Sequence, residues 1–187
     1  MTDSKTSFDR RQLTKALSFG AAGAVFAGKS ALAQDDKSNL VYLQLKDGTV
    51  VIRLRPDLAP KHVERIKELV KRGFYNGIVF HRVIEGFMAQ TGDPTGTGMG
   101  GSDLPNVPAE FSDASFKRGT LGMARSSSPN SANSQFFICF APAPFLDGQY
   151  TVFGEVVSGM EFVDKIKRGE PPANPDKIIS MKLASDA

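Results

Sequence analysis

The sequence predicts a mostly β protein, a closed or nearly closed barrel of six to eight short strands whose open ends are covered by two helices. Short apolar runs with the two-residue period of strands recur along the chain, and only two stretches have the spacing of an amphipathic helix. Eighteen Gly and eleven Pro imply many turns, which favours short strands over long helices. Closure of the sheet would also remove edges that can aggregate.

Strand-like patterns occur at residues 40–45, 50–54, 79–84, 87–90, 119–124, 135–140, 150–157 and 178–183. The first two are joined by Asp47-Gly48, a dipeptide typical of tight hairpins. A helix is expected to begin at Pro60, where a missing N–H is tolerated, and to end before Gly73. A second helix is expected over residues 161–168.

The chain is expected to have three parts: an export signal at 1–33, a polar linker at 34–39 and one folded domain at 40–187. Of the 23 Lys and Arg and the 20 Asp and Glu, residues 1–33 hold five and two, which leaves 18 of each sign in the remainder. The folded domain therefore has no charge excess with which to hold nucleic acid or an anionic membrane.

The first 33 residues have the organisation of a targeting peptide. A basic start contains Arg10-Arg11, a weakly apolar stretch covers 16–28, and Ala31-Leu32-Ala33 gives a small-x-small cleavage pattern. The stretch is too short to span a bilayer, which needs about 20 apolar residues. The segment resembles a twin-arginine signal, which implies export to the bacterial periplasm in folded form and no membrane span in the mature protein. The alternative is an accidental arginine pair in a disordered tail.

Cysteine and histidine are too scarce to suggest a metal centre. Cys139 is the only cysteine, which excludes an internal disulfide, and its apolar surroundings predict a buried, inert thiol. His62 and His81 are the only histidines, and His62 is expected on the surface of the first helix. No metal site is predicted.

Residues 80–93 combine one arginine and one glutamine with several large apolar side chains in a strand broken at Gly86. Strand alternation places His81 on one face and Arg82 on the other, and the relaxed backbone at Gly86 lets Gln90 converge on Arg82. Such a site would hold an apolar group beside one fixed hydrogen-bonding cation. The alternative is a solvent-facing arginine above ordinary core residues.

Two further segments accompany this one: residues 121–138, a small-residue strand, polar loop and aromatic strand, and residues 145–154. In this order and spacing the three segments, with the patterns FHRVI and SQFFI, resemble the cyclophilin family of peptidyl-prolyl cis/trans isomerases. The resemblance extends from residue 40 to residue 183. It implies a closed eight-stranded antiparallel β-barrel capped by two α-helices.

The resemblance also implies roles for individual residues. Arg82 matches the catalytic arginine, Gln90 the glutamine that orients it and bonds the substrate backbone, and Phe87 joins them in the catalytic set. The other positions that match the substrate-binding pocket are His81, Met88, Ala124, Arg125, Gln135, Phe137, Phe145, Leu146 and Tyr150. At Arg125 the family uses backbone groups, so its side chain is not expected to matter.

The implied reaction is rotation of an X–Pro amide, whose barrier of roughly 18–20 kcal/mol comes from lost resonance. In the twisted transition state the nitrogen lone pair becomes a hydrogen-bond acceptor, which a guanidinium can stabilise more than it stabilises the planar ground state. No proton transfer, metal or cofactor is needed. The expected partners are proline-containing unfolded or newly exported polypeptides, handled by a monomer.

Two other functions compete with this one. A barrel that grips proline segments as a chaperone or scaffold with little turnover is disfavoured by the complete set of Arg82, Gln90, Phe87 and Phe137, and a purely structural barrel leaves that set unexplained. Phe145 stands where many eukaryotic relatives have Trp, which implies weak inhibition by cyclosporin. Residues 96–101 fit G-x-G-x-x-G, but Pro105 and Pro108 prevent the helix that a dinucleotide site needs, so a flexible loop bordering the pocket is expected.

Overall fold

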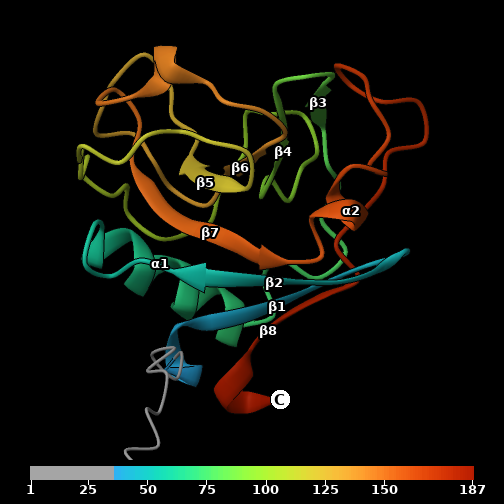
Figure 1. Cartoon of the computed structure of the whole chain (residues 1–187), viewed down its shortest axis with the longest axis horizontal. Helices are drawn as coiled ribbons and strands as arrows, with labels where there is room; N and C mark the ends of the chain where they lie inside the picture. Colours follow the sequence, from blue (N-terminus) through green and yellow to red (C-terminus); the bar gives the residue numbers. More distant parts are fainter. Residues whose placement is uncertain (1–35) are drawn as a thin grey trace, which may run out of the picture. The chain divides into compact units, whose positions relative to one another are not determined.

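The computed structural model describes residues 36–187, so the expected export signal and the first two linker residues lie outside the described part. Eight strands form one antiparallel sheet in the order β3-β4-β6-β5-β7-β2-β1-β8 (Figure 1). The strands are β1 Leu40–Leu45, β2 Gly48–Leu54, β3 Arg82–Ile84, β4 Met88–Thr91, β5 Thr120–Met123, β6 Phe136–Cys139, β7 Val152–Ser158 and β8 Ser180–Leu183. Each of the eight predicted strands is therefore present.

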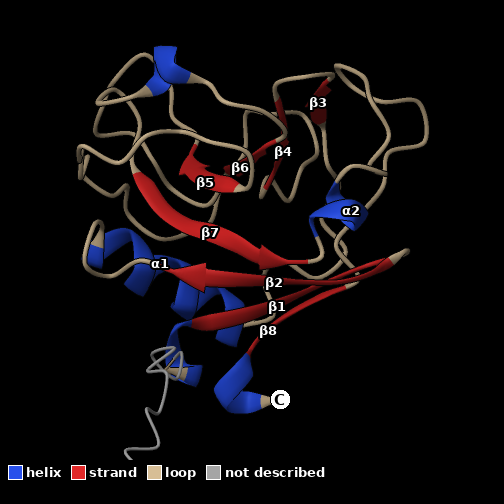
Figure 2. Ribbon diagram, in the orientation of Figure 1, coloured by secondary structure: helices blue, strands red, loops and turns tan. Residues whose placement is uncertain are grey.

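The prediction of a closed barrel is wrong, because the sheet curls without its edge strands pairing with each other (Figure 2). Between the β3 and β8 edges the described residues form isolated bridges, at Val79 with Lys177 and at Val83 with Gly169, and a few further backbone hydrogen bonds, but no strand ladder. The chain that would complete closure contains Pro171, Pro172 and Pro175. Proline has no N–H to donate to a ladder, so this stretch contacts the sheet through separate hydrogen bonds instead of as a continuous strand.

The first helix, α1 Pro60–Lys71, begins at proline as predicted and packs against β7 and β8. His62 on this helix is completely buried, so its expected surface position is wrong. Its Nδ1 lies 2.6 Å from Glu110 Oε2, and the same carboxylate accepts from the backbone N–H groups of Lys61 and His62. The carboxylate of Glu110, in a loop far along the sequence, thus provides acceptors for N–H groups in the first turn of α1 that have no partner within the helix.

The second helix, α2 Met160–Val163, is much shorter than the predicted 161–168. The Arg168 guanidinium donates to the carbonyl oxygens of Asp164 and Ile166, where a continuing helix would place backbone N–H donors. The Lys167 N–H donates to Asp176 instead of to a carbonyl one turn back. Three short 3₁₀ turns complete the described elements: η1 Lys37–Asn39 within the predicted linker, η2 Pro144–Leu146 and η3 Ala184–Asp186.

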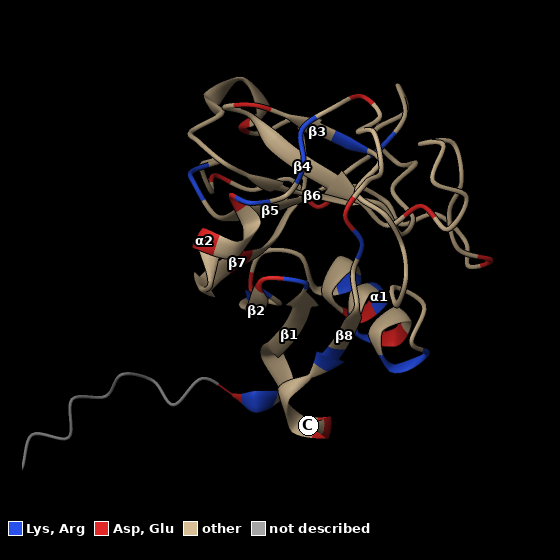
Figure 3. Cartoon of the chain, turned by 90° about the vertical axis from the view of Figure 1, so that its right-hand side faces the viewer, with Lys and Arg blue, Asp and Glu red and all other residues tan. Residues whose placement is uncertain are grey.

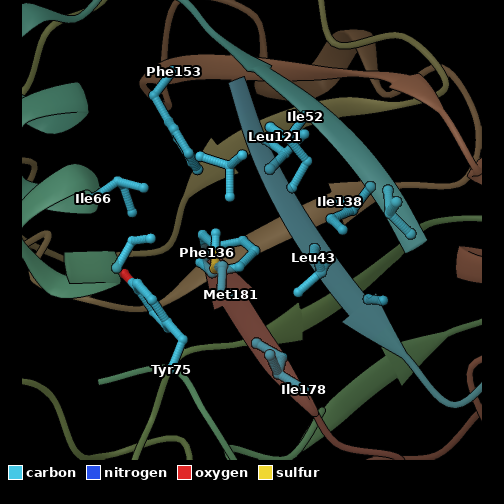
Figure 4. Close-up of a cluster of buried hydrophobic side chains, with 14 of the residues drawn as sticks. Leu43, Ile52, Ile66, Tyr75, Leu121, Phe136, Ile138, Phe153, Ile178 and Met181 are labelled. Carbon is cyan, nitrogen blue, oxygen red and sulfur yellow. The ribbon is translucent and has the colours of Figure 1, made fainter. Parts of the chain in front are cut away.

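The main core lies between α1 and one face of the sheet (Figure 4). Phe136 is its central ring, edge-on to Tyr75 at 5.4 Å and to Phe153 at 6.0 Å between centroids. The Tyr75 hydroxyl donates to Ser134 O at 2.9 Å, which satisfies the one polar atom of this group. Adjacent strand residues point to opposite faces, so Phe137 belongs to a second apolar cluster on the other face.

Candidate active site

The pairing register brings the predicted site residues into one row across the sheet. Arg82 of β3 lies directly opposite Gln90 of β4, which in turn lies opposite Phe137 of β6. Directly opposed residues of neighbouring strands share a face. Gln90 thus converges on Arg82 as predicted, whereas His81 precedes β3 and is buried while Arg82 is exposed.

This row borders a cavity of about 590 Å³. Ten of the twelve predicted site residues line it: His81, Arg82, Phe87, Met88, Gln90, Ala124, Arg125, Phe137, Leu146 and Tyr150. Gly96, Thr97 and Gly98 also line it and belong to the loop that was expected to border the pocket, whereas the sequence did not point to the last two lining residues, Glu170 and Pro171. The cavity therefore joins an apolar floor to a polar rim, the usual composition of a small-ligand site.

The floor of the cavity is built around the Phe137 ring. This ring stacks on Phe116 at 5.7 Å and meets Tyr150 edge-on at 6.0 Å between centroids. Gly122 of β5 lies opposite Phe137, and a Cβ there would come within 2.4 Å of Phe137 Cζ. The absence of a side chain at residue 122 is thus what lets the ring lie flat beneath the cavity.

Phe145 and Gln135, the other two predicted residues, do not line this cavity. Phe145 is 63% exposed and lies at the rim, where its ring is 5.3 Å from that of Phe87. Gln135 lines an adjoining hollow of about 390 Å³ that shares Gln90, Gly98, Ala124 and Arg125 with the cavity. Both residues lie beside the site, one at its edge and one behind Gln90.

Gln135 sets the orientation of Gln90. Gln135 Nε2 donates to Gly98 O at 3.0 Å and to Gly100 O at 2.8 Å, so its Oε1 is the acceptor for Gln90 Nε2 at 2.9 Å. A carbonyl cannot donate, so the two carbonyls fix the amide assignment of Gln135 and thereby that of Gln90. Gln90 Oε1 is left as the acceptor available beside Arg82.

The loop that supplies these carbonyls is organised by the buried carboxylate of Asp93. It accepts from the backbone N–H groups of Thr95, Thr97, Gly98 and Gly100 and from the Thr95 hydroxyl. Burial alone would raise the pKa of Asp93, but these hydrogen bonds outweigh it and lower the pKa to about 2. The glycine-rich loop borders the cavity as expected, and its backbone is tied to one carboxylate.

Arg82 is held from the side opposite Gln90. Its Nε donates to Glu170 Oε1 at 2.8 Å, and within residues 36–187 no hydrogen bond joins it to Gln90. Sequence reasoning missed Glu170, which is 88 positions further along the chain, and no local spacing could have indicated this contact. The remaining guanidinium N–H groups of Arg82 have no partner in the described part of the chain.

His81 and Arg125, which also line the cavity, differ in the number of contacts that hold their side chains. Burial lowers the pKa of His81, and neither of its ring nitrogens has a hydrogen-bond partner among the described residues. Arg125 stacks over the Tyr150 ring at 4.4 Å, and its Nη2 donates to Gln149 O at 2.9 Å. The side chain of Arg125, which was expected not to matter, thus links two loops at the rim.

Three other features of residues 36–187 bear on the earlier expectations. Cys139 is buried, as predicted, and burial raises the pKa of its thiol to about 12. Within these residues no helix is long and apolar enough to cross a bilayer, and no three His, Cys, Asp or Glu cluster as metal ligands would. In the view of Figure 3, basic and acidic residues both occur in several elements of the described chain.

Comparison with known proteins agrees with this geometry. Residues 40–183 match the family described as cyclophilin type peptidyl-prolyl cis-trans isomerase/CLD. The chain is 56% identical over 180 residues to a "Probable peptidyl-prolyl cis-trans isomerase" of Brucella suis, covering 88% of this chain and 90% of the relative. It is 41% identical over 150 residues to a peptidyl-prolyl cis-trans isomerase-like 1 of Aspergillus fumigatus, covering 74% and 91%.

Solved structures show the same fold. The cyclophilin AquaCyp293 from Hirschia baltica superposes with a TM-score of 0.76 at 31% identity, covering 81% of this chain and 76% of that one. A cyclophilin of Cryptosporidium parvum, crystallised in the presence of the dipeptide Ala-Pro, gives a TM-score of 0.72 at 30% identity and covers 77% and 98%. The chain belongs to the cyclophilin-type peptidyl-prolyl cis-trans isomerase family.

Proposed function

We propose that this isomerase accelerates rotation about X–Pro bonds in proteins that fold after export to the periplasm, with Arg82 as the catalytic residue. The observation that carries the proposal is the row formed by Arg82, Gln90 and Phe137 along one wall of an apolar cavity. An apolar floor beside the Arg82 guanidinium suits a proline ring whose amide nitrogen faces that group.

In the proposed mechanism the proline ring rests on Phe137 with Met88 and Leu146 beside it, and the preceding carbonyl swings while the ring stays still. As the amide twists, its nitrogen gains a lone pair that a guanidinium N–H of Arg82 can approach. Gln90 Oε1 accepts an N–H of the substrate backbone or of Arg82. The binding is stronger in the twisted state than in either planar state, which is the condition for catalysis.

The test is cis/trans exchange of a proline-containing peptide measured by NMR, with the full chain and with Arg82→Ala. We expect the wild type to accelerate exchange and Arg82→Ala to lose about 10²–10³-fold, the size of effect seen when a transition-state donor is removed. Arg72→Ala is the matched control, because Arg72 is an exposed arginine that pairs with Glu68 at the end of α1.

The same experiment separates catalysis from simple binding. A binding module would hold the peptide with equal affinity in the wild type and in Arg82→Ala while accelerating exchange in neither. That result would replace the proposal with the chaperone or scaffold reading. Loss of activity in Arg72→Ala as well would show that charge removal, and not Arg82 itself, is responsible.

The place of action rests on the sequence of the first 33 residues, which lie outside the described part. Arg10-Arg11, the weakly apolar stretch and Ala31-Leu32-Ala33 support export by a twin-arginine route. Replacement of both arginines by lysine should leave the chain in the cytoplasmic fraction of a bacterial host, whereas the unmodified chain should be found in the periplasmic fraction. Equal export of both chains would contradict the twin-arginine route.

A further inference from the structure

A short segment of chain lies along the outer edge of β3, at residues 168–170. The Val83 N–H donates to Gly169 O and the Gly169 N–H donates to Val83 O, both at 2.8 Å. Two ion pairs flank this bridge: Arg168 with Glu85, and Glu170 with Arg82. The 168–170 segment is therefore fixed to β3 at three points, and one of them is the arginine of the site.

The bridge sets an antiparallel register that places Glu170 directly opposite Arg82. Opposed residues share a face of the sheet, so Glu170 extends the row of Arg82, Gln90 and Phe137 by one position. Glu170 also lines the cavity, with Pro171 beside it. The catalytic arginine thus lies between an acceptor carboxylate on one side and the Gln90 amide on the other.

From this arrangement we infer that Glu170 is a positioning residue for Arg82, an inference that rests on the proposed function of Arg82. Glu170 accepts from Nε, the donor nearest the aliphatic part of the side chain. Fixing Nε orients the guanidinium plane and leaves both Nη groups free for the substrate nitrogen. An arginine without this contact would sample several rotamers, because its side chain loses considerable entropy when ordered.

The solvent exposure of the Arg82–Glu170 ion pair determines whether its loss changes folding stability or catalytic rate. The Arg82 and Glu170 side chains are 45% and 54% exposed, so solvent screens their attraction and the pair contributes little to folding. Its role is geometric. Loss of Glu170 should therefore lower the rate of the chemical step while leaving peptide affinity and thermal unfolding unchanged.

The first test compares Glu170→Ala with Glu170→Gln at saturating peptide. We expect Glu170→Ala to lower kcat about two- to fivefold, the range that an exposed ion pair allows. Glu170→Gln should recover most of the rate, because its amide oxygen can still accept from Nε. A Glu170→Ala variant as fast as the wild type, or faster, would overturn the inference; the faster variant would mean that the pair restrains Arg82.

Glu85→Ala is the matched control. It removes the other ion pair of the 168–170 segment, Glu85 with Arg168, without removing an atom that contacts Arg82. We expect its kcat to equal that of the wild type. If Glu85→Ala were as slow as Glu170→Ala, the effect would come from anchoring of the segment, and the assignment to Glu170 would be wrong.

Two further measurements isolate the contact itself. In an Arg82→Ala background, Glu170→Ala should cause no additional loss of rate. The Nε–H resonance of Arg82 should exchange slowly with solvent in the wild type and in Glu85→Ala, and faster in Glu170→Ala. This NMR measurement does not depend on turnover: an inactive wild type would refute the proposed function, whereas unchanged exchange in Glu170→Ala would refute the positioning role.

Discussion

Gln90 donates from Nε2 to Oε1 of Gln135 across 2.9 Å, and this direction cannot be reversed in the folded protein. Gln135 donates its own side-chain N–H groups to the carbonyls of Gly98 and Gly100. The glutamine beside Arg82 is therefore oriented by a residue that does not line the main cavity. The direction of the Gln90 amide is therefore set by the carbonyls of the loop at residues 96–101. A substitution at Gln135, outside the main cavity, can change it.

Replacement of Gln135 by Glu should disturb this orientation. A carboxylate has no N–H for the two loop carbonyls and would face their oxygens, which leaves partly buried acceptors unsatisfied at a cost of up to about 1–3 kcal/mol. We expect kcat/KM in the peptide exchange assay to fall about tenfold. Gln149→Glu is the control: Gln149 is exposed at the rim, so a small effect there together with a large one at Gln135 separates the hydrogen bonds from the added charge. Equal losses would contradict the orientation role.

Asp93→Asn should loosen the loop that carries those carbonyls. The amide nitrogen of Asn cannot accept from backbone N–H groups, so some of the donors now satisfied by the carboxylate would lose their partner. Since hydrogen bonds to a charged group contribute about 1.5–3 kcal/mol, we expect the free energy of unfolding at pH 7 to fall by about 2 kcal/mol. Urea unfolding measures the change, and Asp113→Asn, at an exposed carboxylate, should leave it unaffected.

The same substitution has a distinct pH signature. The pKa of Asp93 is lowered to about 2 from an ordinary value of 3.8, so its stabilisation is complete above pH 3.8 and is lost as the pH falls towards 2. Wild type and Asp93→Asn should therefore differ at pH 5 and converge as the pH approaches 2. A difference between them that stayed constant over this range would show that the carboxylate charge is not what organises the loop.

Much of this site follows from patterns in the sequence, and the exceptions have a common cause. Strand alternation and the break at Gly86 were enough to bring Gln90 towards Arg82, because both effects are local. The Glu170 contact and the capping of His62 by Glu110 depend on pairing over 88 and 48 positions, which no local pattern reports. His62 is buried by a loop that lies 48 positions further along the chain, so the helical pattern around it predicts exposure.

The open edge of the sheet also depends on contacts that no local pattern reports. Strand-like patterns at eight places suggested closure, and each of the eight strands exists. Whether the first and last edges meet depends on the path of the chain before β8, where Pro171, Pro172 and Pro175 prevent a ladder. The same path brings Glu170 next to Arg82. The segment that leaves the sheet open therefore also adds Glu170 to the row of Arg82, Gln90 and Phe137.

Gly122→Ala tests the floor of the cavity. The new Cβ would lie 2.4 Å from Phe137 Cζ and 2.6 Å from Phe116 Cε1, so the stacked rings would have to move. Overpacking of this kind costs about 1–3 kcal/mol, and displacement of Phe137 should reduce peptide affinity. In a Phe137→Leu background the alanine should cost less, because the smaller side chain leaves room. Thermal unfolding and peptide titration measure both effects, and additive losses would contradict the direct clash.

His62 should make stability depend on pH between neutrality and mild acid. Burial lowers its pKa below the ordinary 6.5, and the neighbouring Glu110 carboxylate opposes this shift without reversing it. Below about pH 6.5 the unfolded chain therefore binds more protons than the folded chain, and stability falls as pH decreases, by at most about 1.4 kcal/mol per pH unit for one histidine.

His62→Asn removes this titration. We expect the variant to be less stable than the wild type at pH 8, because the hydrogen bond to Glu110 changes, and to lose less stability between pH 7 and pH 5. His81 is the other histidine and its pKa is also lowered by burial, so it should supply the slope that remains. Urea unfolding at half-unit pH steps gives both slopes; a wild-type slope that His62→Asn left unchanged would mean that His62 is not the group that takes up the proton.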